Sequence, residues 1–119
     1  MFDHTILSRF ESLETPFYYY DLALLDQTLK TCKSAADRHD FHVHYAFKAN
    51  FDVKVLKAIQ AIGFGADCVS GNEIRKAIEI GFNPDKVVFA GVGKSDKEIT
   101  VALNNDIYCF NVESVQNWV

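Results

Sequence analysis

The sequence predicts an α/β fold, the first half of a TIM-like (β/α)8 barrel. Four apolar, strand-like runs recur at similar intervals along the chain: residues 43–47, 66–69, 87–90 and 107–110. Segments with helical periodicity fill the intervals between them. Strands separated by single helices pair in parallel through right-handed crossovers. The four βα units are half the number that a closed barrel needs.

An open four-stranded sheet of the flavodoxin type is the alternative architecture. It predicts helices on both faces of the sheet and a phosphate-binding loop after the first strand. The first turn, residues 48–51, reads KANF and contains no glycine. This turn therefore favours the half barrel.

Local signals delimit the helices. Residues 52–62 place their apolar side chains on one face, and Gly63 follows as a left-handed cap. Ser70 and Ser95 each precede a glutamate by three residues, a spacing typical of a capping box at a helix start. Asn111 is expected to cap a last helix.

The chain divides at about residue 40. Residues 1–40 are expected to form an N-terminal strand and a helix that lead into the barrel. The aromatic run at residues 17–20 predicts the strand, and the apolar spacing of residues 21–38 predicts the helix. Residues 41–119 supply the four βα units. The second half of such a barrel is not among these 119 residues.

Composition narrows the classes of function. Of the residues, 49% are apolar, which predicts a packed core, and the formal net charge of −4 comes from well-mixed charges. No apolar run reaches the ~20 residues of a membrane helix. The N-terminus lacks the basic and apolar regions of a signal peptide. We therefore expect a cytoplasmic protein that binds neither nucleic acid nor membrane.

Cysteines and histidines predict no metal site. Cys32, Cys68 and Cys109 are odd in number and widely spaced, so we expect buried, reduced thiols rather than disulfides or zinc ligands. His42 and His44 share one strand face, but no third ligand lies at a suitable spacing.

Two charged residues near strand ends form the candidate site. Lys48 ends the first barrel strand, and alternation places it in the barrel mouth above Ala46, which leaves room for a flat ring. Asp67 lies near the same end of the second strand. A buried lysine can form a Schiff base with an aldehyde, and a carboxylate would hold the positive charge of the resulting imine. The plainer alternatives are a solvent-reaching lysine and a carboxylate that caps a loop amide.

The turn after the third strand offers a second, less specific signal. Gly91 and Gly93 would let the backbone approach a ligand closely. They would equally suit a turn that leads to the helix cap at Ser95.

Several stretches resemble the fold-type III pyridoxal-phosphate enzymes. Residues 45–50 read YAFKAN, which resembles the cofactor-lysine motif of that family. The opening TPFYYYD at residues 15–21 looks most like the diaminopimelate decarboxylases. GADCVSGNE at residues 65–73 and FAGVGKS at residues 89–95 match that pattern in order and spacing. One departure is the turn at residues 90–93, where many members carry a histidine and asparagines.

The resemblance implies a lyase of lysine biosynthesis. It would release CO2 from meso-diaminopimelate to give L-lysine, with pyridoxal 5'-phosphate held as a Schiff base on Lys48 and Asp67 beside the imine. By this resemblance, the family's phosphate loop, its acidic partner of the pyridine nitrogen, its substrate arginine and its C-terminal β domain would lie beyond residue 119. The chain by itself is therefore expected to be inactive, and the intact enzyme to be a homodimer.

Two other functions stay open. One is a different amino-acid decarboxylase or racemase of the same fold type. The other is a half barrel without catalytic activity that folds by self-association.

Overall fold

The structure is a computed structural model that describes residues 4–115. Its elements, in chain order, are α1 (His4–Phe10), α2 (Leu22–Arg38), β1 (His44–Ala46), the 3-10 turn η1 (Phe47–Ala49), α3 (Val53–Ala61), β2 (Gly65–Cys68), α4 (Gly71–Ile80), the 3-10 turn η2 (Pro84–Lys86), β3 (Val87–Phe89), α5 (Asp96–Asn104) and β4 (Cys109–Phe110).

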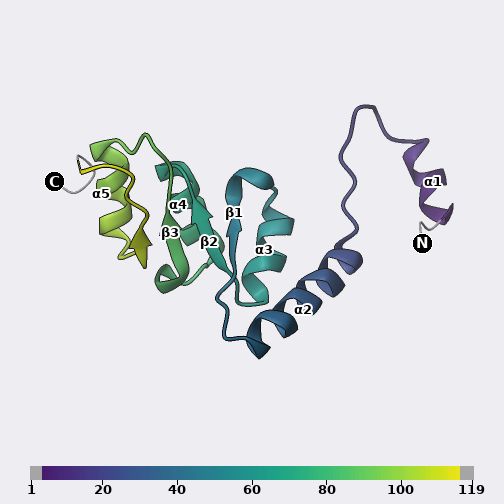
Figure 1. Cartoon of the computed structure of the whole chain (residues 1–119). Helices are drawn as coiled ribbons and strands as arrows, with labels where there is room; N and C mark the ends of the chain where they lie inside the picture. The colour runs from purple at the N-terminus through teal and green to yellow at the C-terminus, as the bar shows by residue number, and fades with distance from the viewer. Residues whose placement is uncertain (1–3, 116–119) are drawn as a thin grey trace.

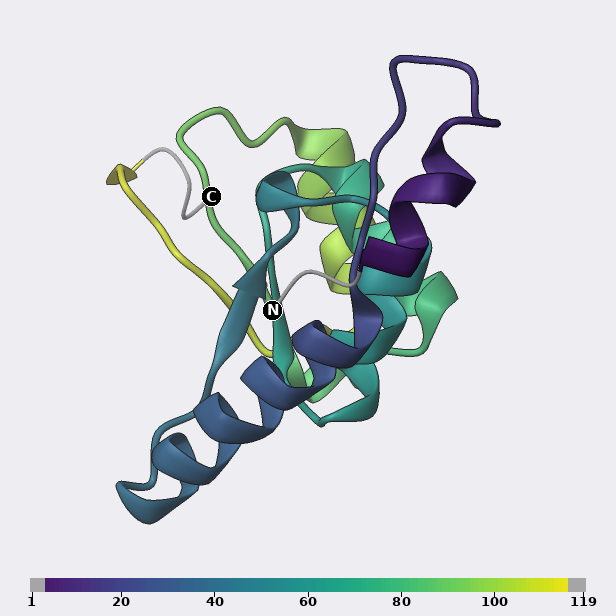
Figure 2. The ribbon, with the colours of Figure 1, turned by 90° about the vertical axis from the view of Figure 1, so that its right-hand side faces the viewer.

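The four strands form one parallel sheet in the order β1-β2-β3-β4. Figures 1 and 2 show α3, α4 and α5 on the same side of this sheet. A flavodoxin-type sheet would reverse its strand order and carry helices on both faces. The sequential order and the one-sided helices therefore confirm the partial (β/α) barrel.

The hydrophobic core lies between the sheet and the helices. Side chains alternate along each strand, so β2 and β3 present one set of residues to the helices and the other set to the open face. The helix-facing set is fully buried, with 0% exposure for Ala66, Cys68, Val87 and Phe89. The helices contribute a second buried set, Leu56, Ile59, Ile74, Ala77 and Ala102.

Strands β1 and β2 approach closely because Gly65 has no side chain. His44 pairs with Gly65 in the register, and its ring lies over that glycine. A Cβ at Gly65 would lie 2.3 Å from Cδ2 of His44 and 2.4 Å from the carbonyl oxygen of Lys86. His44 also keeps a buried Nε2 that has no hydrogen-bond partner within residues 4–115.

Most of the helix boundaries follow the sequence signals. The capping box at Ser95 is present, and Gly81 ends α4 with a φ of 102°. The box expected at Ser70 is only half formed. Ser70 accepts a hydrogen bond from the Glu73 amide, but the Glu73 carboxylate bonds the Val69 amide instead of closing the box. No helix follows directly on Asn111, since residues 111–114 carry no helix, and the residues after 115 lie outside the described part of the chain.

The strand expected at residues 17–20 is wrong for the described chain. The segment is extended but has no strand assignment, because no neighbouring strand lies beside it to complete a ladder. Its alternating rings pack locally instead. Phe17 and Tyr19 lie against Phe10, and Tyr18 stacks on Tyr20 with ring centroids 6.4 Å apart.

The N-terminal arm extends away from the sheet, as Figure 1 shows. The radius of gyration is 17.3 Å, compared with ~13.5 Å for a compact domain of this length. Large apolar side chains are correspondingly exposed, among them Tyr18 at 89%. These surfaces have no covering layer within residues 4–115.

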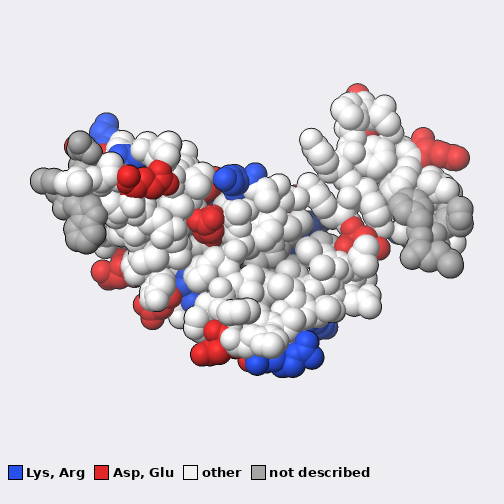
Figure 3. All heavy atoms as spheres, in the orientation of Figure 1, with Lys and Arg blue, Asp and Glu red and all other residues white. Residues whose placement is uncertain are grey.

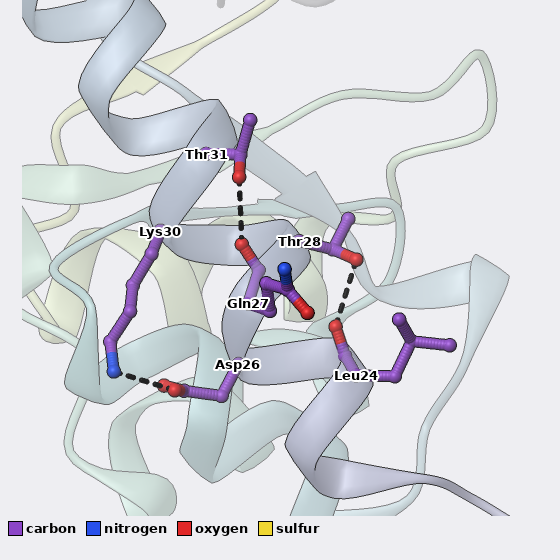
Figure 4. A network of polar contacts seen from close by, with 6 residues as sticks. All are labelled: Leu24, Asp26, Gln27, Thr28, Lys30 and Thr31. Carbon is purple, nitrogen blue, oxygen red and sulfur yellow. Dashed lines mark hydrogen bonds and ion pairs between the residues drawn. The ribbon is translucent and has the colours of Figure 1, made fainter. Parts of the chain in front are cut away.

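Helix α2 is amphipathic. Leu29 and Ala36 are buried, and the helix packs beside α3. Figure 4 shows part of its polar network, in which Lys30 pairs with Asp26 at 2.6 Å and Thr28 donates to the Leu24 carbonyl oxygen at 2.8 Å. Exposed pairs of this kind contribute about 0.3–0.5 kcal/mol to the helix itself. Both contacts lie within α2, so it is the apolar stripe that packs the helix against the rest of the chain.

Charges of both signs are interspersed over the face shown in Figure 3. That face carries no continuous basic stripe of the kind that follows a nucleic-acid backbone. Among residues 4–115, no helix combines the length and the apolar character needed to cross a bilayer.

We predict that the 119-residue chain by itself is not a stable monomer. Strands β1 and β4 each have one unpaired edge within the described residues, and the inner face of the sheet is only partly covered, with Ala46 and Asp67 half-buried and Lys48 exposed. Exposed strand edges and apolar faces recruit further chains. Multi-angle light scattering at low micromolar concentration should show dimers or larger species. A monodisperse monomer that unfolds cooperatively would contradict this expectation.

Candidate functional site

Lys48 lies immediately after β1. The strand ends at Ala46, and the next three residues, Phe47–Ala49, form the 3-10 turn η1. Phe47 is fully buried and anchors this turn in the core through edge-on contacts with Phe51 and Phe82. The turn lies beside β2, so the backbone of Lys48 is held at the C-terminal edge of the sheet.

The side chain of Lys48 is exposed, which differs from the burial expected at the end of an apolar strand. The reason is that the inner face of the sheet has no second layer within residues 4–115. Its amine makes no hydrogen bond or ion pair with any described residue. Lys48 is therefore an accessible amine at the edge where barrel enzymes place their active sites.

Asp67 lies on the neighbouring strand, one register position from the same edge. It pairs with Ala46 of β1 and Val88 of β3. Its flanking residues Ala66 and Cys68 face the helices and are fully buried, so Asp67 belongs to the inner face. The register thus brings Asp67 beside the strand end that carries Lys48.

The carboxylate of Asp67 is incompletely satisfied. Its Oδ1 atom is buried and has no hydrogen-bond partner among residues 4–115. A buried carboxylate oxygen without a donor is costly, and nearly all such atoms in folded proteins are paired. The alternative in which Asp67 caps a loop amide does not account for this oxygen. The site therefore calls for a donor or a cation from outside the described residues.

Sequence reasoning did not predict the hydrogen-bond partners of three charged residues near this edge. Glu73 accepts a hydrogen bond from the Val69 amide at 2.6 Å, and Glu98 accepts one from the Gly71 amide at 3.0 Å. Lys94 donates to the carbonyl oxygens of Gly91 and Asn111. A glutamate three residues after a helix cap was visible in the sequence, but the 27-residue separation between Gly71 and Glu98 left no local signal.

The turn after β3 is fixed by Lys94. Its Nζ lies 5.5 Å from the ring centroid of Phe89. It donates to the carbonyl oxygens of Gly91 and Asn111, which lie just after β3 and β4. Gly91 has a φ of 98° and lies against Val69 of the preceding turn. The positive φ of Gly91 favours glycine, and a Cβ there would make ordinary contact with Val69 at 3.5 Å.

Cys68 is a packing residue, as its position on the strand indicated. Burial, together with the nearby carboxylates of Glu73 and Asp67, raises the pKa of its thiol to about 12. The thiol is therefore protonated at neutral pH and is a poor nucleophile. All three cysteines are free, but the expectation that they are buried is wrong for Cys32, which is exposed on α2.

A cavity of about 250 Å³ opens at the opposite edge of the sheet, where the strands begin. His44, Gly65, Lys86 and Tyr108 are among its lining residues. It lies away from Lys48 and Asp67. Within residues 4–115, no group of three or more histidine, cysteine and acidic side chains could hold a metal ion.

A parallel sheet in sequential strand order, with a helix after each of its first three strands, is the arrangement of a (β/α) barrel, whose active sites lie at the C-terminal ends of the strands. The family model described as "Pyridoxal-dependent decarboxylase, pyridoxal binding domain" matches residues 22–118. The chain belongs to this family of pyridoxal-dependent decarboxylases.

The similar curated proteins are diaminopimelate decarboxylases. The enzyme of Bacteroides thetaiotaomicron is 51% identical over 110 residues, which are 92% of this chain and 28% of the relative. That of Aquifex aeolicus is 39% identical over 106 residues, 89% of this chain and 25% of the relative. The chain thus spans about a quarter of the length of these relatives.

Solved structures give the same result. Diaminopimelate decarboxylase from Helicobacter pylori, complexed with L-lysine, has a TM-score of 0.83 and 37% identity, over 93% of this chain and 28% of that one. The enzyme from M. jannaschii, also in complex with L-lysine, has a TM-score of 0.85 and 28% identity, over 93% and 27%.

The residues present fit a pyridoxal group. Its aldehyde requires an accessible amine, and Lys48 offers one that has no competing partner among the described residues. The positive charge that results requires an anion, and Asp67 offers a buried oxygen without a donor. Ala46, the register partner of Asp67, is small enough to leave room for a ring.

We predict that thiol reagents distinguish the cysteines. Cys32 should react with iodoacetamide within minutes at neutral pH, whereas Cys68 should stay unmodified, because it is buried and its pKa is about 12. Peptide mass spectrometry of the native full-length protein measures both. The denatured protein is the control, in which all three cysteines should react. Equal labelling of Cys32 and Cys68 in the native state would contradict the prediction.

Proposed function

We propose that the whole protein is a diaminopimelate decarboxylase, which removes CO2 from meso-diaminopimelate and releases L-lysine. The observation that carries this proposal is the pair formed by the free amine of Lys48 and the unpartnered Oδ1 atom of Asp67 on adjacent strands. The relatives support diaminopimelate as the substrate within this family, since the diaminopimelate decarboxylase of Bacteroides thetaiotaomicron is 51% identical over the aligned residues.

Pyridoxal 5'-phosphate, when bound, would supply the electron-withdrawing ring that accepts the electrons left at the carbon losing CO2. Lys48 would hold the cofactor covalently by its Nζ. Because the turn η1 follows directly from β1 and is anchored by buried Phe47, the lysine backbone stays fixed while the side chain reaches over the edge of the sheet. The role of this chain is thus to position the amine.

Asp67 would complete the electrostatics. Its carboxylate lies on the inner face. Once Nζ of Lys48 is bonded to the cofactor, this carboxylate would keep that nitrogen protonated, which favours electron withdrawal. Val88 beside it is apolar and 9% exposed, and this limits the water that could screen the carboxylate. A negative charge fixed before the reaction needs no reorganisation when positive charge develops.

The substrate class follows from the relatives. The structures from H. pylori and M. jannaschii hold L-lysine, which would be the product here. Lysine/ornithine decarboxylase from Vibrio vulnificus shares the fold at a TM-score of 0.82 but only 23% identity. That likeness is evidence for the fold and not for the substrate.

Assembly and location are part of the proposal. The uncovered inner face and strand edges support closure by the rest of the protein and association with a second copy. A cytoplasmic location agrees with three cysteines that form no disulfide. The 119 residues alone, with an open barrel, would not turn over substrate.

We predict that Lys48→Ala in the full-length protein abolishes both turnover and the visible absorption of the bound cofactor, because the covalent attachment is lost. Absorbance after gel filtration and release of CO2 from meso-diaminopimelate measure the two effects. Lys57→Ala is the matched control on α3, since Lys57 is also exposed and forms no contact with the site. Normal absorption and turnover in Lys48→Ala would refute the assignment.

We predict that Asp67→Asn lowers kcat at least ~10-fold, equivalent to about 1.4 kcal/mol, with little change in Tm. The amide keeps the shape of the side chain but removes the negative charge. Asp26→Asn on exposed α2 is the control for loss of a carboxylate, and it should leave kcat unchanged. A large fall in Tm with intact kcat would instead give Asp67 a role in folding.

A further inference from the structure

One carboxylate serves the N-termini of two neighbouring helices. Oε1 of Glu98 accepts a hydrogen bond from the Gly71 amide of α4 at 3.0 Å. Its Oε2 accepts from the amide and the hydroxyl of Ser95, at 3.1 and 2.8 Å, and so closes the capping box of α5. Helix N-termini carry amides without intrahelical partners and favour a negative charge. Glu98 therefore ties α4 to α5 at the edge of the sheet where the strands end.

The contact between Glu98 and Gly71 is closely packed. Gly71 is buried, and a Cβ at its position would lie 3.0 Å from Cγ of Glu98. The donors act on the ionised form of the carboxyl. The Gly71 amide, followed by the hydroxyl and amide of Ser95, lowers the pKa of Glu98 below its ordinary value. The hydrogen bonds at this interface therefore favour the ionised form of Glu98.

Glu98 reaches the turn that follows Asp67. Two residues, Val69 and Ser70, separate β2 from Gly71. From within its own unit this turn is held by Glu73, whose carboxylate accepts from the Val69 amide at 2.6 Å. From the next βα unit it is held by the bond between Glu98 and Gly71. The turn is therefore fixed on both sides, within four residues of Asp67.

We infer that Glu98 is a positioning residue for Asp67, one that holds the β2–α4 turn and thereby the carboxylate at the edge of the cofactor site. This inference rests on the proposed function, in which the Asp67 carboxylate faces the cofactor. Small displacements of a positioned group are costly in turnover, since a shift of about 1 Å can cost up to ~10²-fold. Glu98 itself touches neither substrate nor cofactor.

The test compares Glu98→Ala with Ser95→Ala in the full-length protein. Both changes weaken the cap of α5, but Ser95→Ala leaves the Glu98 carboxylate available to Gly71. Glu98→Ala should lower kcat about 10-fold, with KM changed less than about 2-fold, because a misplaced group affects the transition state. Ser95→Ala should keep kcat within about 2-fold of the unmodified protein, at a similar fall in Tm. Glu98→Gln, which retains an oxygen for the Gly71 amide, should recover most of the lost kcat.

A second readout does not depend on activity. Hydrogen–deuterium exchange of the peptide that covers residues 69–74 should speed up in Glu98→Ala and stay slow in Ser95→Ala. The visible circular dichroism of the bound cofactor should change in Glu98→Ala alone. If Glu98→Ala does not fold, Glu98→Asp should show the same kcat loss, since its shorter side chain cannot reach Gly71.

The outcomes separate the two proposals. Equal kcat values and equal exchange for Glu98→Ala and Ser95→Ala would overturn the positioning role, as would normal kcat in Glu98→Asp. Normal turnover in Lys48→Ala would overturn the proposed function instead, and the exchange data would still report whether Glu98 holds the β2–α4 turn.

Discussion

Parallel pairing in strict sequential order is the constraint on which the rest of the molecule depends. Because every strand runs the same way, the C-terminal ends of β1 to β4 meet at one edge, together with the N-termini of the helices that follow. The register between β1 and β2 then places Asp67 opposite Ala46, two residues before Lys48. Lys48 and Asp67 are 19 positions apart in the chain, and this strand pairing brings them to the same edge of the sheet without a direct bond between them.

Two kinds of polar group share this edge. Around its rim, two charged side chains form hydrogen bonds with backbone groups. Glu98 accepts from the amides of Gly71 and Ser95, and Lys94 donates to the carbonyl oxygens of Gly91 and Asn111. On the inner face, the amine of Lys48 and one oxygen of Asp67 have no partner among residues 4–115. Satisfied groups give rigidity. A buried oxygen without a partner, such as Oδ1 of Asp67, beside an exposed amine in a rigid frame is typical of sites that take up a ligand.

The sequence predicted the regular elements well wherever the signal was local. The caps expected at Ser70 and Ser95 both accept a hydrogen bond from a backbone amide at the helix start. The strand expected at residues 17–20 failed because a strand needs a partner, and the alternation of aromatic residues cannot show whether one is present. The burial expected for Lys48 failed for a related reason: it requires a covering layer that residues 4–115 do not supply.

The sequence by itself determined the order of strands and helices and the caps at Ser70 and Ser95, and it made Lys48 and Asp67 the candidate site residues, because periodicity, turn chemistry and a six-residue motif are local properties. Tertiary structure alone decided what those residues meet. It set the register that places Asp67 opposite Ala46, left Oδ1 of Asp67 without a donor among residues 4–115, and brought Glu98 to Gly71 across 27 residues. Contacts of that kind depend on how two βα units pack against each other, and no local pattern encodes that packing.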